Sequence, residues 1–192
     1  MIHIDVRHDI AGLQARLQLL PKERMQAAVR ALNRTMTTVR AEASREMRKA
    51  YPGLKVSTLK RRIRFTRATR AKALATLTFS AKRFRLVGNW NVRQTKQGIR
   101  GRLPWRLETA DGTEIPASAL RQGFIRAATN TGVSNVWLRD GKARYPIQAV
   151  LAPGLNAAFV ERHIGRALSR TARARFAVVF EQEARFRLSR RT

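Results

Sequence analysis

The chain has 192 residues, 44% of them hydrophobic, which suits one domain with a buried core and is too short for two domains of ordinary size. It carries 40 Lys and Arg residues against 12 Asp and Glu, so its net charge is +28, and 32 of the cations are Arg. A net positive charge of this size indicates an anionic partner, either nucleic acid or acidic protein. The absence of cysteine excludes a disulfide framework and a thiolate metal site.

The first fifty or so residues predict one strand and two helices. Residues 2–8 alternate apolar and polar as in a half-buried strand, and Asp9 is placed to cap a short helix over Ile10 to Leu20. From Lys22 to about Ala50 the spacing of apolar residues predicts one long α-helix with a single packed face. The residues of this stripe are Met25, Val29, Leu32, Met36, Val39, Ala43 and Met47.

The middle of the chain predicts antiparallel strands interrupted by a loop region. A short helix capped by Ser57 or Thr58 precedes three alternating runs that we interpret as a meander of strands. These runs are residues 63–66, 74–79 and 83–86. Residues 88–121 are rich in Gly, Gln, Asn and Arg, and we expect a flexible basic loop there.

The last third predicts further strands and a second long helix. Strands over 123–127 and 135–139 are followed by a third over 144–147, which Asp140-Gly141 joins to the second as a hairpin. After Pro153-Gly154, apolar residues recur at about one helical turn. They are Val160, Ile164, Leu168, Ala172, Phe176, Phe180 and Ala184.

These elements together predict an α+β fold. We expect long N-terminal and C-terminal helices packed on a mostly antiparallel sheet, with an extended basic loop region. The whole chain, residues 1–192, is expected to form a single domain. No stretch repeats at a fixed period, which argues against a solenoid or a propeller.

The residue types that carry catalysis are sparse and scattered. There are three His residues, His3, His8 and His163, and the spacing of the first two is not that of a helical metal site. Glu181 and Glu183 lie two apart, so on a helix they point to different faces, as suits ion pairs with neighbouring Arg. We therefore expect no enzymatic activity, no metal and no cofactor.

Two groups of cations are candidates for contact with nucleic acid or an acidic partner. The first is the dense run Lys60, Arg61, Arg62, Arg64, Arg67 and Arg70. The second lines one side of the last helix and consists of Arg162, Arg166, Arg170 and Arg173, continued by Arg175. Like charges at such spacings repel each other unless a partner neutralises them. For the first run, the alternative is a solvated face with no partner.

The three tryptophans are interpreted as core or interface anchors. Trp137 lies in a predicted strand, which favours the core. Trp90 and Trp105 are candidates for contact between subunits.

Several segments resemble the phage minor tail protein Z family, also described as tail completion proteins of long-tailed phages. Ala31-Leu32-Asn33-Arg34-Thr35, with Val39-Arg40 and Arg45, is similar to the opening signature of that family. Gly123-Phe124-Ile125 and the later run from Val136 to Gly154 resemble its Phe-Ile strand and its late hairpin. Asn33 and Arg34 lie off the apolar stripe, so we expect them to bond a neighbouring loop or subunit.

The resemblance implies a non-enzymatic virion protein that acts late in tail assembly, at the head-proximal end of the tail. It implies head–tail joining and placement of the DNA end, with the protein made in the host cytoplasm. It further implies a homo-oligomer, a hexameric ring, that meets tail terminator, tail tube and head-completion proteins, with non-specific contact to genomic DNA. We expect no membrane contact, because no run of residues approaches the roughly 18 apolar positions of a spanning helix and the start lacks a signal-peptide pattern.

The main alternative is a stand-alone nucleic-acid-binding protein. The charge favours it, whereas the lack of a helix-turn-helix, zinc or base-stacking motif argues against it. A DNA-processing enzyme is a further alternative, which would be revived if substitution of Asp5, Asp9 or Glu108 abolished an activity.

Overall fold

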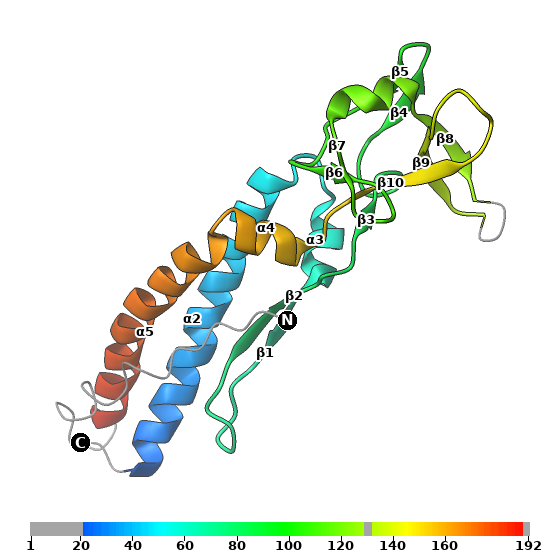
Figure 1. Ribbon diagram of the computed structural model, residues 1–192. Coiled ribbons are helices and arrows are strands. Elements are labelled where there is room, and N and C mark those ends of the chain that lie inside the picture. The colour runs from blue at the N-terminus through cyan, green and yellow to red at the C-terminus, as the bar shows by residue number, and fades with distance from the viewer. Residues whose placement is uncertain (1–20, 129–131, 190–192) are drawn as a thin grey trace. The chain divides into compact units, whose positions relative to one another are not determined.

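The computed structural model describes residues 21–128 and 132–189 and confirms the α+β class (Figure 1). The strand expected over residues 2–8 and the helix expected over 10–20 lie outside the described residues. A long helix lies near each end of the described chain, and antiparallel strands occupy the sequence between them.

The described residues form two compact units. Unit 1 consists of residues 21–45, 63–79 and 159–189, and unit 2 consists of residues 46–62, 80–128 and 132–158. Each unit has its own buried apolar residues. The expectation of one domain over the whole chain stays a prediction.

The predicted long helix is confirmed as α2 (Pro21–Ala50). Proline suits the first helical position, because its missing N–H would have no partner inside the helix there. The apolar stripe is buried along most of its length, at Leu32, Met36, Val39, Ala43 and Met47. Met25, expected in the same stripe, is 42% exposed. The helix ends before Pro52 and Gly53, whose φ of +81° is a conformation that glycine adopts without strain.

In unit 1, α5 (Ile164–Leu188) runs antiparallel to α2 (Figure 1). Side-chain contacts join residue 26 to 187, 34 to 183, and 42 to 171, so positions ascend on one helix as they descend on the other. β1 (Ile63–Thr66) and β2 (Thr76–Phe79) form an antiparallel pair in the same unit, as predicted. The Phe79 ring lies 4.6 Å from that of Phe159.

The predicted C-terminal helix is divided in two by a sharp break. α4 (Leu155–Glu161) ends before His163, which has a φ of 52°, and α5 begins at the next residue. The predicted apolar stripe is buried throughout α5. Val160, predicted in that stripe, is 61% exposed, because the left-handed residue between the helices changes the phase of the helical repeat.

Unit 2 contains a six-stranded antiparallel sheet in which β7-β6-β10-β9-β8 are neighbours and β3 also pairs with β10. The predicted hairpin is confirmed, with Arg139 opposite Ile147, but its second strand is Ile147–Ala152 instead of 144–147, and residues 140–146 form the connection. The strands are β3 (Phe84–Arg85), β6 (Leu107–Glu108), β7 (Glu114–Ile115), β8 (Phe124–Ala127), β9 (Ser134–Arg139) and β10 (Ile147–Ala152). The short helix α3 (Val56–Arg62) precedes β1, as expected.

Two expectations about the middle of the chain are corrected. The run 83–86 does not extend the β1–β2 pair, because β3 pairs with β10. Residues 88–121 are not one continuous loop, because they contain the hairpin of β4 (Arg93–Thr95) and β5 (Gly98–Arg100), then β6, β7 and the 3-10 helix η2 (Ala117–Gln122). Gly98 makes this possible, since its φ is +100° and an added Cβ would lie 2.4 Å from the Leu120 carbonyl oxygen.

An aromatic cluster lies in the core of unit 2. The ring centroids of Tyr51 and Phe84 are 5.8 Å apart, and Trp90 meets Phe84 edge to face at the same distance. The Tyr51 hydroxyl donates toward the carbonyl oxygens of Gly154, at 2.9 Å, and Pro153, at 3.2 Å. This cluster joins the end of α2 to β3 and to the segment after β10.

Candidate functional site

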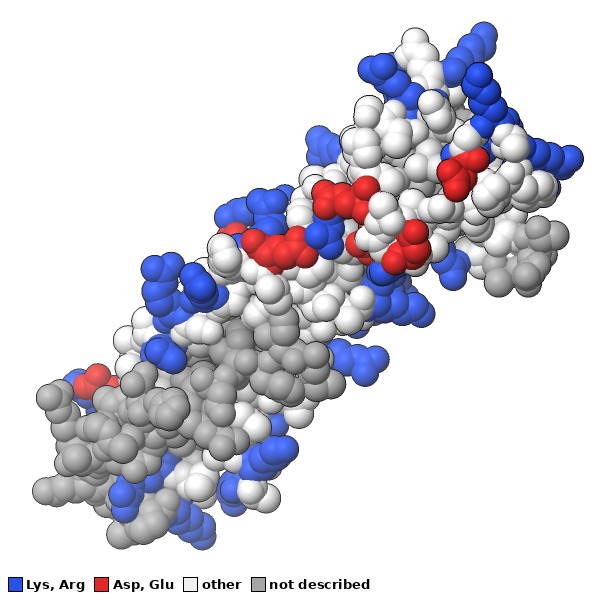
Figure 2. All heavy atoms as spheres, viewed as in Figure 1, with Lys and Arg blue, Asp and Glu red and all other residues white. Residues whose placement is uncertain are grey.

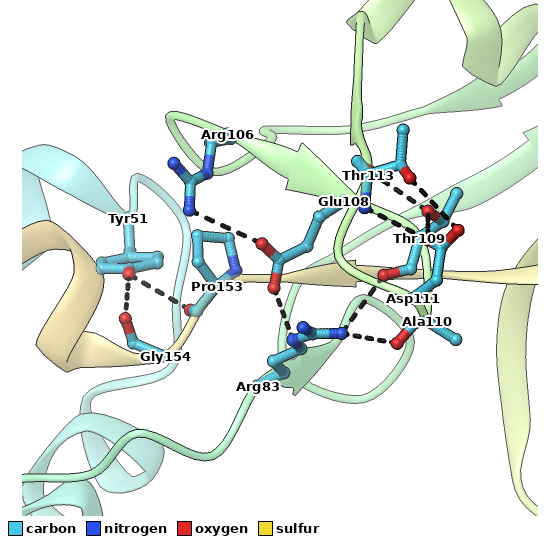
Figure 3. A network of polar contacts seen from close by, with 10 residues as sticks. All are labelled: Tyr51, Arg83, Arg106, Glu108, Thr109, Ala110, Asp111, Thr113, Pro153 and Gly154. Carbon is cyan, nitrogen blue, oxygen red and sulfur yellow. Dashed lines mark hydrogen bonds and ion pairs between the residues drawn. The ribbon is translucent and has the colours of Figure 1, made fainter.

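Glu108, the buried carboxylate considered above as a catalytic candidate, lies in a network of structural contacts (Figure 3). Its Oε1 is 2.8 Å from Arg83 Nε, and its Oε2 is 3.6 Å from Arg106 Nη2. Arg83 also donates to the carbonyl oxygens of Ala110, at 2.7 Å, and Thr109, at 3.3 Å. Glu108 therefore holds Arg83, which fixes the turn after β6, and also lies near Arg106.

Asp111 fixes the same turn from the other side (Figure 3). It accepts hydrogen bonds from the Thr109 hydroxyl and from the backbone N–H and hydroxyl of Thr113. The bond from the Thr109 hydroxyl and then that from the Thr113 N–H lower the pKa of the Asp111 carboxyl below its ordinary value. Both carboxylates therefore act in the turn, and neither is aimed at a reactive centre.

Metal-ligating groups do not cluster in the part of the chain that the structure describes. No group of three or more His, Asp or Glu side chains within residues 21–128 and 132–189 is placed to hold a metal ion. Within the same residues, no helix is long and apolar enough to cross a membrane. The candidate chemistry therefore concerns surface charge.

The predicted run of cations from Lys60 to Arg70 is divided between the two units. Lys60, Arg61 and Arg62 end α3 in unit 2, whereas Arg64, Arg67 and Arg70 lie on β1 and the following loop in unit 1. All six are exposed except Arg62, which is half-buried. The run is thus continuous in sequence but belongs to two separate surfaces.

Arg62 has a structural role. Its guanidinium lies 5.0 Å from the centre of the Phe84 ring and donates to the Ser80 hydroxyl at 3.1 Å. Burial, and then the neighbouring Arg61, lower the pKa of the Arg62 guanidinium, which as an arginine remains charged. Of the three cations that end α3, Lys60 and Arg61 are the ones that face solvent.

The arginines predicted on the last helix form one exposed stripe of unit 1. Arg162 lies two residues before α5, ahead of His163, and Arg166, Arg170 and Arg173 follow on the helix, all exposed and spaced by three or four residues. Two residues further along lie the buried positions Ile164, Leu168 and Ala172, about 200° around the helix. Arg166 and Arg170 therefore lie opposite the buried positions in the first turns of α5, whereas the position two residues after Arg173 is the exposed Arg175. Figure 2 shows how widely Lys and Arg cover the molecule in comparison with Asp and Glu.

The stripe borders a shallow groove of about 660 Å³ between the end of α4 and the start of α5. Arg166, Arg170 and Arg173 line it together with the exposed Val160. Within the described chain, no carboxylate forms an ion pair with these three arginines. Their charge is therefore open to a partner.

The structure gives Asn33 and Arg34 contacts inside unit 1. The Asn33 amide donates to the Ala68 carbonyl oxygen at 3.0 Å and accepts from the Ala68 N–H at 2.8 Å, so it fixes the loop after β1, as expected for a loop contact. Arg34 Nη1 lies 2.7 Å from Glu183 Oε1 on α5. The Arg34 side chain is 59% exposed, so a further subunit contact stays a prediction.

The two tryptophans considered for subunit contact differ in burial. Trp90 is 3% exposed, and its Nε1 donates to the Pro52 carbonyl oxygen at 2.9 Å, so its side chain belongs to the core of unit 2 instead of the surface. Trp105 is half-buried under the Arg106 guanidinium, 4.9 Å from its ring. The Trp105 indole N–H is buried and has no hydrogen-bond partner among the described residues. Subunit contact by Trp105 stays a prediction.

Sequence reasoning missed a third group of arginines, on the β4–β5 hairpin and η2. Arg93 and Arg100 are direct cross-strand partners. Arg93, Arg100 and Arg102 line a groove of about 430 Å³, and Arg100 and Arg121 line another of about 810 Å³. The signal in the sequence is the turn Lys96-Gln97-Gly98, whose positive-φ glycine brings the two flanking arginines opposite each other.

The comparisons with known proteins identify the family of this chain. Its sequence matches the family described as prophage minor tail protein Z (GPZ) over residues 12–191. No curated protein and no solved structure gave a match. Members of this family are structural components of phage tails, and the match covers nearly the whole chain. The chain therefore belongs to the prophage minor tail protein Z family and is a structural protein of the phage virion.

Proposed function

We propose that this tail protein completes the tail and joins it to the head, as a subunit of a hexameric ring at the head-proximal end. Its neighbours there would be further copies of itself, the tail terminator, the tail tube and head-completion proteins, with the packaged DNA nearby. The role needs no catalysis, which agrees with the structural use of Glu108 and Asp111 in a turn.

One observation carries this proposal: the arginines of the α5 stripe are exposed and have no ionic partner in the described chain. Three arginines on one helix face repel each other. Their repulsion lowers the stability of the free subunit, whereas an anionic surface that covers them attracts all three charges. A protein that functions only in an assembly can carry such a face.

The net charge of +28 also bears on ring formation. Copies of a strongly basic subunit repel each other, so a closed ring needs anionic surfaces on its neighbours or DNA in its channel. Diffuse arginine contacts suit a channel, because they attract phosphate without reading the base sequence. The ring would then assemble late, once these neighbours are in place.

The test is localisation of the protein in purified particles by cryo-electron microscopy. We expect a closed ring at the neck or upper tail, with the α5 stripe against an acidic surface of a neighbouring protein. The triple variant Arg166→Gln, Arg170→Gln and Arg173→Gln should fold but leave tails that do not join heads. Particles that lack the protein, or normal head–tail joining by the variant, would contradict the proposal.

The alternative of a stand-alone nucleic-acid-binding protein is favoured by the net charge alone. It predicts salt-sensitive binding to free DNA and absence from particles. Presence in particles as a ring would remove it.

A further inference from the structure

The β4–β5 hairpin and η2 carry a second basic surface, in unit 2, which the proposed function above does not assign. Two features distinguish it from ordinary surface charge. The arginines line grooves, and two of them lie directly opposite each other on paired strands. The surface is defined here by Arg93, Arg100, Arg102 and Arg121 and is called the hairpin arginine cluster.

The cross-strand pair is the strongest observation. Arg93 and Arg100 are partners in the β4–β5 register, and side chains at such positions have Cβ atoms about 5 Å apart. Like charges in this arrangement destabilise the strand pair. Neither groove is lined by an Asp or Glu residue of the described chain, so no carboxylate there offsets the repulsion, although Arg100 donates a hydrogen bond to the Gln97 side-chain oxygen. An anionic ligand would neutralise both guanidinium groups, so the relief of their repulsion would favour its binding.

The cluster is held in place by close backbone contacts. A Cβ on Gly98 would lie 2.4 Å from the Leu120 carbonyl oxygen, and one on Gly101 would lie 2.8 Å from that of Asn91. The Gln94 side chain accepts a hydrogen bond from the Ile125 N–H of β8 at 2.9 Å. The backbone of the hairpin is therefore fixed against η2 and β8, so it needs little ordering when a ligand binds.

The lining of the grooves selects the kind of anion. Ser118, Gln97 and Asn91 add hydrogen-bonding groups beside the arginines, which suit phosphate oxygens. No aromatic side chain lines either groove, so there is no platform on which unpaired bases could stack. The α4–α5 groove of unit 1 differs, because the exposed Val160 gives it an apolar wall that a phosphate backbone would not use.

We propose that the hairpin arginine cluster binds the phosphodiester backbone of duplex DNA without reading its sequence. This inference rests on the proposed virion role only for the natural source of the DNA. Binding of DNA by the purified chain can therefore be tested independently of ring formation. The contact would be made by guanidinium groups on phosphate oxygens, and its strength would fall with salt as counterions are released.

The test is fluorescence anisotropy of the full chain with duplexes of unrelated sequence over a range of salt concentrations. The variant Arg93→Gln, Arg100→Gln and Arg102→Gln should lose about three phosphate contacts. The slope of log K against log salt should then become shallower by about 2.7, and affinity should fall at least about tenfold at 100 mM salt. The matched control is Arg166→Gln, Arg170→Gln and Arg173→Gln, which removes the same charge from α5 and should change affinity by less than about threefold.

Two further measurements keep the test sharp. The variant Arg93→Lys, Arg100→Lys and Arg102→Lys keeps the charge and should retain most of the binding. Circular dichroism should show that all variants fold. Equal loss in the hairpin and α5 Gln variants, full loss in the Lys variant, or single strands bound ten times more tightly than duplex would each overturn the inference. The proposed head–tail function would fail differently, by absence of the protein from particles.

Discussion

The two units expose arginine in different ways, and the difference reflects how each one is stabilised. In unit 1, a buried apolar seam runs along each of the antiparallel helices α2 and α5, and the arginines of α5 occupy exposed positions of a regular helix. In unit 2, short strands and turns are fixed by particular polar contacts, such as those of Glu108 and Asp111. Its arginines on the β4–β5 hairpin and η2 come together through that local strand pair and through the packing of Gly98 against η2.

This comparison predicts that the units respond to different substitutions. Apolar truncation should affect unit 1 most, because its helices depend on packing along their length. Loss of a single polar group should affect unit 2 most, because one side chain there holds several backbone groups. Four substitutions test this, from the largest expected effect to the smallest.

Phe176→Ala should lower the free energy of unfolding by about 3–5 kcal/mol, because a fully buried ring is removed from the seam. The ring stacks on Phe180 with centroids 5.8 Å apart, and that contact is lost too. Urea unfolding and amide hydrogen exchange should place the damage in α2 and α5. The control Val178→Ala, at a position 47% exposed, should cost less than about 0.5 kcal/mol. Equal loss of protection in β9 and β10 would show that the units are not energetically distinct.

Glu108→Gln should lower the free energy of unfolding by about 2 kcal/mol, less than a fully buried ion pair would, because Arg83 and Arg106 are partly exposed. Amides of β6, β7 and β10 should exchange faster, while those of α5 stay unchanged. Glu114→Gln removes the same charge from the exposed residue opposite Glu108 and serves as the control. A similar loss from both variants would assign the effect to net charge instead of the network.

Asn33→Ala should cost about 1–2 kcal/mol, because two hydrogen bonds to the Ala68 backbone are lost together. The loop between β1 and β2 contains Arg67, Arg70 and Lys72, so trypsin should cut it faster in the variant. Thr37→Ala on an exposed part of the same helix should leave the cutting rate unchanged. If trypsin cuts Asn33→Ala no faster than wild type, the contact does not hold the loop.

Asp111→Asn should give the smallest effect, recognised by its pH dependence. Hydrogen bonds lower the pKa of Asp111 in the folded protein, so its contribution to stability is present above the unfolded value of about 3.9. That contribution is lost as pH falls through the folded pKa. The difference in Tm between wild type and variant should therefore be constant near pH 7 and vanish in acid. A difference that grows toward low pH would reverse the assignment.

The faces of α2 and α5 could be predicted from sequence because a helix repeats every 3.6 residues, and neighbours along the chain decide which side is buried. Val160 was assigned wrongly because the left-handed His163 breaks that repeat, and histidine gives no warning of it in the sequence. The hairpin at Asp140-Gly141 was predictable because its turn and both strands are local.

Other features of the fold and of the basic surfaces could not be predicted, because they depend on which strands pair and how the elements pack. β3 continues the alternation of β1 and β2, yet its partner is β10, and nothing near Phe84 in the sequence identifies that strand. The division of the cation run between two units and the opposition of Arg93 and Arg100 likewise depend on register and packing. The sequence could identify individual arginines and lysines as candidates for partner contact. Which of them lie together on one surface depends on how the strands pair.

The corner between α4 and α5 restricts which amino-acid substitutions this protein can accept during evolution. A Cβ on Gly165 would lie 2.5 Å from the Phe159 ring, which is itself packed on Phe79. A side chain at position 165 therefore requires the Phe159 ring to shift or to be replaced by a smaller side chain. Among natural variants of this tail protein, these two positions should covary, with alanine or serine at 165 found only beside a residue smaller than phenylalanine at 159.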